Sequence, residues 1–224
     1  LNTTTAGLAI GEPRLDAALA PVTQLYISAR RDTDVLSLRD LSLDSDAIKA
    51  NGTGLISSES AQITLSAHAA ELSQFDPKLS GEGTLASAVT WEKGGALRIL
   101  ALEAEGSGAT IAAEGEAFLS EPGRPFEGAL SLDAADLSRF AGLVGRPFAG
   151  QVTLDAEGSG KLDASALSAS IDMEGRAVRT GMAELDRLVA GDISLTGAGS
   201  YAKGQAPDLQ YLRLDTARLD TNAS

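Results

Sequence analysis

The sequence predicts a mainly β protein, an elongated antiparallel repeat sheet with a few short helices covering its edge. Three observations predict this fold. Apolar and polar residues alternate with period two over many short stretches, which is typical of half-buried strands. Gly, Asp or Asn bounds each stretch, and successive stretches lie about 12 to 16 residues apart, as in an antiparallel meander. Finally, the chain repeats itself internally, which indicates stacked similar units.

The clearest repeat is the pattern Leu-x-x-Leu-x-Leu, which occurs at 38–43, 97–102 and 209–214. The first and third copies stay in register at an offset of 171 residues, and similarity continues after them. A second repeat relates 69–75 to 134–140, and a third relates 102–108 to 154–160. We therefore expect one continuous array over 1–224, with approximate units 1–68, 69–133, 134–181 and 182–224.

The strand stretches have one aliphatic side and one polar side. Counting them predicts about 13 to 15 strands. Clear examples are 25–30, 61–66, 128–133, 151–155 and 192–196. A sheet built from them has one dry face and one wet face.

The leucines of the first hexamer change parity within the repeat. Leu36 and Leu38 are even-numbered, whereas Leu41 and Leu43 are odd-numbered. A one-residue bulge near Arg39 would bring all four to one face and increase the local twist. A short loop between two strands would explain the same change, and the sequence leaves both readings open.

Four Ala- and Leu-rich stretches have helical spacing instead of alternation. They are 13–19, 70–75, 134–143 and 182–189. Asp133 or Asp136 is a suitable N-cap for the third. We expect short helices that cover an edge or end of the sheet, which is a common protection against edge-to-edge aggregation.

The composition excludes several classes of protein. The formal net charge is −13 and the longest basic run is two residues, so a nucleic-acid backbone would be repelled. Cysteine is absent, which suits a periplasmic or secreted protein as well as a cytosolic one. No apolar run approaches the roughly 20 residues of a membrane helix. Both ends fall inside the repeat array, so we expect the chain to be an internal part of a longer protein.

No group of residues predicts catalysis. The single His68 lies in an alternating run, and its equivalent in the second repeat is Asp133, which indicates a polar surface position. Asp40, Asp44 and Asp46 lack the glycine and the closing glutamate of an EF-hand loop. The glycine clusters 106–108 and 158–160 lack the context of a dinucleotide fingerprint and are interpreted as hairpin turns. We expect no enzyme, no cofactor and no metal site.

The order of these features resembles the repeat of the TamB family, AsmA-like periplasmic proteins of Gram-negative bacteria. An Ala-rich helical turn is followed by a strand, the leucine hexamer and a short strand ending near Asn-Gly or Gly. The stretches that match are 13–52, 70–115, 134–160 and 182–222. The resemblance implies a folded-over sheet with an apolar groove, an inner-membrane anchor outside this chain, and an outer-membrane barrel partner bound through another segment.

The function that the resemblance implies is phospholipid movement between the two membranes, assistance in outer-membrane protein assembly, or both. The partner would be phospholipid, with its acyl chains in the groove, in a periplasmic protein tethered to the inner membrane. An apolar sheet face lacking aromatic filling suits acyl chains independently of the family. The candidate lipid-facing residues are Leu36, Leu38, Leu41, Leu43, Leu97, Leu100, Leu102, Val152, Leu154, Ile193, Leu195, Leu209, Leu212 and Leu214.

Two other classes of function stay open. One is a structural or adhesive β repeat, such as a β-helix or autotransporter-like domain with no lipid groove. The other is a hydrolase or lectin on a β scaffold. A β-helix fills its interior and repeats about every 18 to 25 residues, whereas the offsets here are 52, 65 and 171.

Overall fold

The chain is mainly β and antiparallel, as the alternation predicts. The computed structural model describes residues 2–5, 23–74, 77–141, 145–189, 191–216 and 220–223, and strands make up 69% of them. The chain divides into two compact units, Leu1–Ser107 and Gly108–Ser224. The predicted subdivision into four smaller repeat units stays a prediction.

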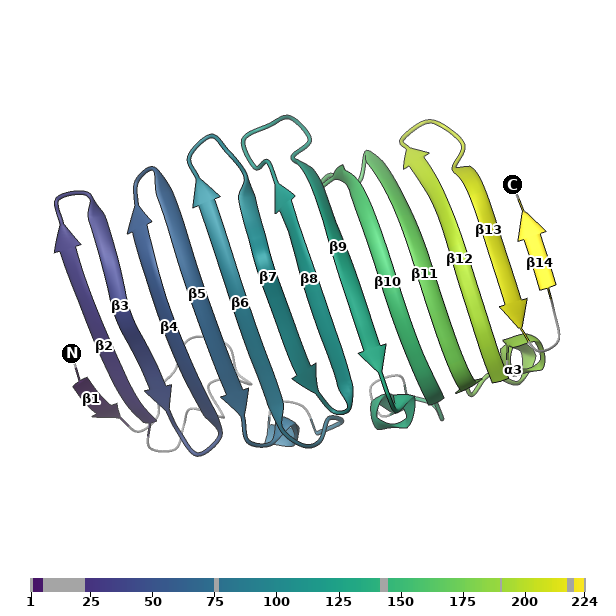
Figure 1. Cartoon of the computed structure of the whole chain (residues 1–224), viewed down its shortest axis with the longest axis horizontal. Helices are drawn as coiled ribbons and strands as arrows, with labels where there is room; N and C mark the ends of the chain where they lie inside the picture. Colours follow the sequence, from purple (N-terminus) through teal and green to yellow (C-terminus); the bar gives the residue numbers. More distant parts are fainter. Residues whose placement is uncertain are drawn as a thin grey trace. The chain divides into compact units, whose positions relative to one another are not determined.

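Unit 1 is an antiparallel meander of seven described strands, in which each strand pairs with the next one along the chain (Figure 1). The strands are β1 (Asn2–Thr5), β2 (Thr23–Asp32), β3 (Val35–Asp44), β4 (Ile48–Ser57), β5 (Ser60–Ala69), β6 (Gly83–Glu92) and β7 (Leu97–Gly106).

Unit 2 repeats the same plan with seven further described strands (Figure 1). They are β8 (Ala109–Ala117), β9 (Pro125–Ala134), β10 (Ala149–Lys161), β11 (Ala166–Arg179), β12 (Gly191–Ala202), β13 (Asp208–Thr216) and β14 (Asp220–Ala223). The fourteen strands of the described residues fall inside the predicted range.

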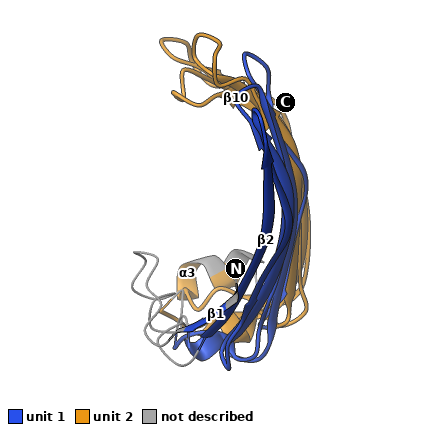
Figure 2. Cartoon of the chain, turned by 90° about the vertical axis from the view of Figure 1, so that its left-hand side faces the viewer, with its two compact units in different colours: residues 1–107 blue, residues 108–224 orange. Residues whose placement is uncertain are grey.

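Each unit has two different ends, because successive connections of a meander lie alternately at opposite ends of the strands. At one end, here the hairpin end, β2–β3, β4–β5 and β6–β7 are joined in unit 1, and β8–β9, β10–β11 and β12–β13 in unit 2. The opposite end, here the helix end, has the helical connections: η1 (Leu72–Gln74), η2 (Leu137–Phe140) and α3 (Ala183–Val189). Figure 2 shows bowed strands in each unit, with α3 on the concave side of unit 2.

Three of the four predicted helices are therefore present in shorter form, at the strand ends. The prediction for 13–19 lies outside the described residues. Asp136 is the N-cap of η2, and its carboxylate accepts a hydrogen bond from the Ser138 backbone N–H at 3.0 Å. Of the two proposed caps, Asp136 is thus the one used.

The bulge reading of the leucine hexamer is confirmed. Leu38 pairs with Gly54 and Leu41 with Gly52, so β3 has one extra residue there; against β2 the unpaired residue is Arg39. In the third copy the unpaired residue is Gln210, which is the equivalent of Arg39 at the 171-residue offset. The second copy differs, because its bulge against β6 falls at Leu100.

The 171-residue repeat also extends to strand register. Leu41 pairs with Gly52 in unit 1, and Leu212 pairs with Ala223 in unit 2, at the corresponding positions. In the first and third copies the hexamer thus coincides with the same bulge and the same alignment with the following strand.

One turn prediction is wrong. The glycine cluster 158–160 lies inside β10, which continues to Lys161, and the hairpin follows it. A Cβ on Gly160 would stand 2.5 Å from the Ala166 carbonyl oxygen, so glycine serves close strand approach there. The cluster 106–108 does form a turn, with positive φ at Ser107 and Gly108.

Candidate functional site

The candidate site is the apolar face of the sheet, which the strand register defines in each unit. Residues directly opposite each other in an antiparallel pair point to the same face. In unit 1, Leu36, Leu38, Leu41 and Leu43 face Ile56, Gly54, Gly52 and Ala50, which alternate along β4. All four leucines therefore share one face.

This face continues across unit 1 through every described strand from β2 to β7. From β4 the register leads to Ile63 and Leu65 on β5, then to Val89 and Ser87 on β6. The last step pairs Trp91 with Leu97 and Ser87 with Leu102 on β7. The predicted residues Leu97 and Leu102 thus join the same face as the leucines of β3.

Leu100 is the exception among the predicted residues of unit 1. It is the bulged residue of β7 and has no pairing partner on β6. Ile99, which pairs with Val89, takes the position on the apolar face instead. Leu100 remains 51% exposed.

Unit 2 has an equivalent apolar face. From β9 to β13, one row across the sheet reads Leu132, Leu154, Met173, Leu195 and Leu214. The predicted residues Val152, Ile193, Leu209 and Leu212 lie on the same face in neighbouring rows. Every predicted site residue of this unit is therefore on one face.

Sequence reasoning missed part of this face. Ile63, Val89, Leu130 and Ile171 belong to it as well. They follow the same period-two alternation as the predicted residues, so extending that count to every strand would have found them.

The apolar face is poorly covered. Among the described residues the buried apolar side chains are only Ala47, Ala96, Ala134, Leu137 and Val178. Large aliphatic side chains in the middle of the face stay open to solvent, for example Ile63 at 41% and Leu130 at 42% exposure. The face is thus an extended apolar surface without the dense packing of a protein core.

Short helical connections close the face at its helix end. In unit 1, the side chain of Leu72 on η1 lies against Gly83 and Gly106. A Cβ added to either glycine would stand 2.6 Å from a methyl carbon of Leu72. In unit 2, Leu137 of η2 and Val178 of β11 are buried. Because these sheet positions are glycine, the Leu72 side chain can pack directly against the backbone and fill that end of the surface.

The opposite face is polar. His68 lies there, 44% exposed, with its Nε2 3.7 Å from a Glu82 carboxylate oxygen, as expected of a surface position. Like charges stand directly opposite each other at Asp155–Asp172 and at Glu116–Glu127, an arrangement that costs stability unless water screens it.

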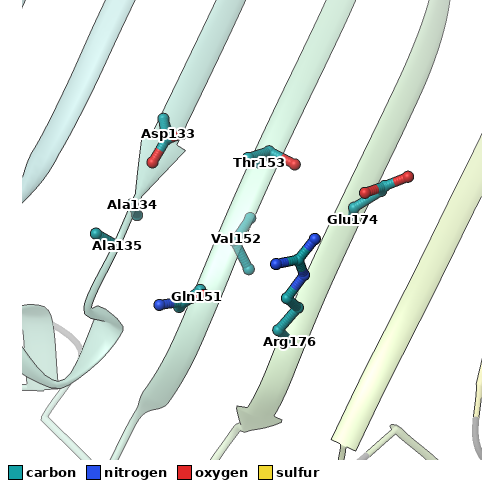
Figure 3. A pocket seen from close by; sticks show the side chains of 8 residues that line it. All are labelled: Asp133, Ala134, Ala135, Gln151, Val152, Thr153, Glu174 and Arg176. Carbon is teal, nitrogen blue, oxygen red and sulfur yellow. The ribbon is translucent and has the colours of Figure 1, made fainter.

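A polar hollow of about 230 Å³ lies near the helix end of unit 2. Figure 3 shows Asp133 on β9, Gln151 and Thr153 on β10, and Glu174 and Arg176 on β11 around it. It opens widely to solvent, and its mixed charges form no nucleophile–base pair, so we assign it no chemistry.

The carboxyl groups with shifted pKa values serve the turns. Hydrogen bonds from the Ser73 and Gly81 backbone N–H groups lower the pKa of Glu71. The Ser138 hydroxyl and backbone N–H lower the pKa of Asp136, and the Ser165 hydroxyl and backbone N–H do so for Asp163. The Thr180 backbone N–H and hydroxyl lower the pKa of Asp186. Because each carboxylate accepts bonds within a turn or helix start, these shifts indicate capping.

The described residues contain no group of three or more His, Cys, Asp or Glu side chains placed to hold a metal ion. No helix within this part of the chain is long and apolar enough to cross a membrane.

Comparisons with protein-family models, with curated proteins and with solved structures all return no match.

Proposed function

We propose that this chain is a segment of a TamB-like periplasmic protein whose apolar sheet face carries phospholipid acyl chains between the inner and outer membranes. In this proposal the whole protein is tethered to the inner membrane through another segment. A contribution to outer-membrane protein assembly, which the family resemblance also implies, belongs to the same proposal.

The observation that carries the proposal is the apolar face that runs through successive strands in each unit and that no layer of the described residues covers. A sheet face of this kind is stable in water only if something buries it. Acyl chains suit it, because each CH₂ group removed from water contributes about 0.8 kcal/mol. Apolar contacts are non-directional. The surface therefore suits a ligand that can slide along it better than a ligand that must be held in one fixed pose.

A structural or adhesive β repeat is the alternative, and two features count against it. A parallel β-helix has parallel ladders and a filled interior, whereas the ladders here are antiparallel. Side chains such as Leu36 and Leu209, 40% and 47% exposed, are not packed as in a filled interior.

The test is site-specific photo-crosslinking to lipid. Leu43 and Leu102 lie on the apolar face, whereas their neighbours Ser42 and Ala101 pair with residues of the polar face. We expect a photo-reactive residue at Leu43 or Leu102 to capture phospholipid during expression in a Gram-negative host, as detected by mass spectrometry of the purified adduct. Ser42 and Ala101 are the matched controls. Equal capture from both faces, or capture from neither, would reject the proposal.

A further inference from the structure

The hairpin loops of unit 2 have large apolar side chains that the fold leaves in solvent. Leu119 lies in the loop between β8 and β9, and Leu162 lies in the loop between β10 and β11. Leu119 is 42% exposed and Leu162 is 53% exposed, the highest value of any large apolar residue that the structure describes. Exposed turn positions are normally polar or glycine. Packing within the chain therefore gives no reason for leucine in these loops.

The hairpin loops of unit 1 provide a contrast. They are 33–34, 58–59 and 93–96, and their sequences are Thr-Asp, Ser-Glu and Lys-Gly-Gly-Ala. Ala96 is the one apolar residue of these three loops, and it is buried. Val35, which follows the first loop and is 39% exposed, already belongs to β3. Among the described hairpin loops, exposed leucine is thus a property of unit 2.

The three loops of unit 2 lie side by side at the hairpin end (Figure 1). The Leu162 backbone N–H donates to the Arg124 carbonyl at 3.1 Å, and the Lys203 backbone N–H donates to the Ser165 carbonyl at 2.8 Å. A Cβ on Gly123 would stand 2.8 Å from the Cδ of Lys161, so the first loop also packs against the start of the second. The loops therefore form one ordered border.

This border is electrically balanced, with one charge of each sign on each hairpin. The charged residues are Glu121 and Arg124, Lys161 and Asp163, and Lys203 and Asp208. The Ser165 hydroxyl and backbone N–H lower the pKa of Asp163 most, and the charges of Lys161 and Lys203 lower it further. The next charges along β8 and β9, Glu116 and Glu127, are opposite each other on the polar face.

The balance of charge indicates the kind of surface that the border fits. The chain as a whole has a formal net charge of −13, and an acidic surface is repelled by anionic lipid. The border has no such net charge, and it presents both signs together with apolar side chains. A zwitterionic phospholipid surface, which also presents both signs above an apolar layer, is its complement.

The apolar face of unit 2 begins directly behind these loops. Its last residues at the hairpin end include Phe126, Leu167 and Tyr201: Phe126 and Leu167 both pair with Gly160, and Leu167 pairs with Tyr201. Aromatic rings are favoured where an apolar region meets water and lipid headgroups. An acyl chain that leaves a bilayer at the loops would therefore pass directly onto the apolar face.

We propose that the hairpin end of unit 2 docks on the surface of a phospholipid bilayer, with Leu119 and Leu162 inserted among the headgroups and the first acyl carbons. This inference rests on the proposed function and adds to it the place where phospholipid passes between a membrane and the apolar face. Arg124, Lys161 and Lys203 stay in the headgroup layer, because a long cationic side chain can extend its charge into water while its stem covers apolar surface.

The first test uses a fluorescent label in the full chain. The sequence contains no cysteine, so a single introduced cysteine can be labelled with nitrobenzoxadiazole, whose emission depends on the polarity around it. On addition of phosphatidylcholine vesicles, we expect the labels of L119C and L162C to shift to the blue and gain intensity. The matched controls are D34C and S58C, in exposed hairpin loops of unit 1, and their labels should not respond.

The second test measures co-sedimentation with the same vesicles. Leu162→Asp should lower the vesicle partition coefficient about tenfold, because it removes an apolar contact and places a charge in the interface. Leu55→Asp is the matched control, since Leu55 is 52% exposed and pairs with Ser37 and Gln62 on the polar face. It adds the same charge at the same exposure and should bind vesicles like the parent.

The outcomes separate this inference from the proposed function. Uptake of a short-chain phosphatidylcholine below its critical micelle concentration measures the apolar face without a bilayer. If Leu162→Asp keeps this uptake and loses vesicle binding, docking through the loops is supported. If the parent takes up no monomeric lipid, the proposed function fails, whatever the labels report.

Three results would overturn the docking surface while leaving the proposed function intact. The first is uptake of monomeric lipid by the parent without any response of the labels at 119 and 162 to vesicles. The second is a response only to phosphatidylglycerol vesicles at low salt, which would indicate electrostatic adsorption. The third is self-association of the parent that Leu162→Asp abolishes, which would assign the leucines to a protein contact.

Discussion

Glycine residues on the apolar face set how closely the strands of unit 2 approach. Gly115 and Gly128 stand opposite each other, and a Cβ on Gly128 would lie 2.6 Å from the Glu114 carbonyl oxygen. That contact is with backbone, which cannot rotate away as a side chain would. The next residue in the row is Gly158, so the apolar face has a shallow strip of small residues between its aliphatic and aromatic rows.

Gly128→Val should lower the free energy of unfolding by about 1 to 3 kcal/mol, the usual cost of forcing extra volume into a close contact. Ala129→Val is the matched control, because Ala129 points to the polar face between Glu114 and Glu157. Urea unfolding monitored by circular dichroism measures both. Equal stability of the two variants would show that the strands can move apart without cost.

At the scale of the strand, the bulge is what makes the leucine hexamer one-sided. If Arg39 were paired like an ordinary strand residue, period two would send Leu36 and Leu38 to one face and Leu41 and Leu43 to the other. The first and third copies place the bulge at the same hexamer position, Arg39 and Gln210. The hexamer is therefore a sequence signature for a bulged strand.

Deleting Arg39 tests this signature. Arg39 is the extra residue of β3, so its removal leaves plain alternation with all four leucines on the apolar face. We therefore expect the deletion variant to fold, with no increase in binding of a hydrophobic dye such as ANS. Arg39→Ala keeps the bulge and changes only an exposed side chain, so its melting temperature should stay within about 2 °C of the parent, as for most surface substitutions.

Deleting Ser42 is the contrast, because Ser42 is paired with both β2 and β4. Its removal should move Leu43 to the polar face or force a new register, so we expect a lower melting temperature and increased ANS binding. If the two deletions behave alike, the unpaired residue does not fix the faces.

Much of the architecture at this scale follows from local pattern. Alternation predicts the strands, and the change of parity after Leu38 predicts the bulge, because both depend on neighbours in sequence. The cluster 158–160 lies in a strand and not in the predicted turn, because strand length depends on pairing: β10 extends to Lys161 alongside β9. The pairing of β7 with β6 likewise decides that Leu100 is the bulged residue of β7.

Residues far apart in the chain show what the sequence does not reveal. Arg124, Lys161 and Lys203 form no basic run, and only the meander brings the hairpins that contain them side by side. The period-two pattern predicts which residues share a face. How near each residue lies to the hairpin end or to the helix end follows only from the strand register.

At the scale of the whole molecule, the question is whether the apolar face is an open surface or a packed core. The two respond differently to a buried charge. An unpaired charge in a core costs several kcal/mol, whereas an arginine on an open face can extend its guanidinium into water. Leu102 is half-buried on the face opposite Ser87, and Leu137 is only 6% exposed.

Leu102→Arg should therefore leave the melting temperature within a few degrees of the parent while abolishing lipid binding, because a charge interrupts the surface on which acyl chains would slide. Leu137→Arg should unfold unit 2 or lower its melting temperature by about 10 °C or more, since several kcal/mol corresponds to shifts of that size. Thermal melts together with lipid mass spectrometry of both variants give the answer. Collapse of the fold on Leu102→Arg would mean that the face is buried in the native protein, and the chain would then be a structural repeat in place of a lipid conduit.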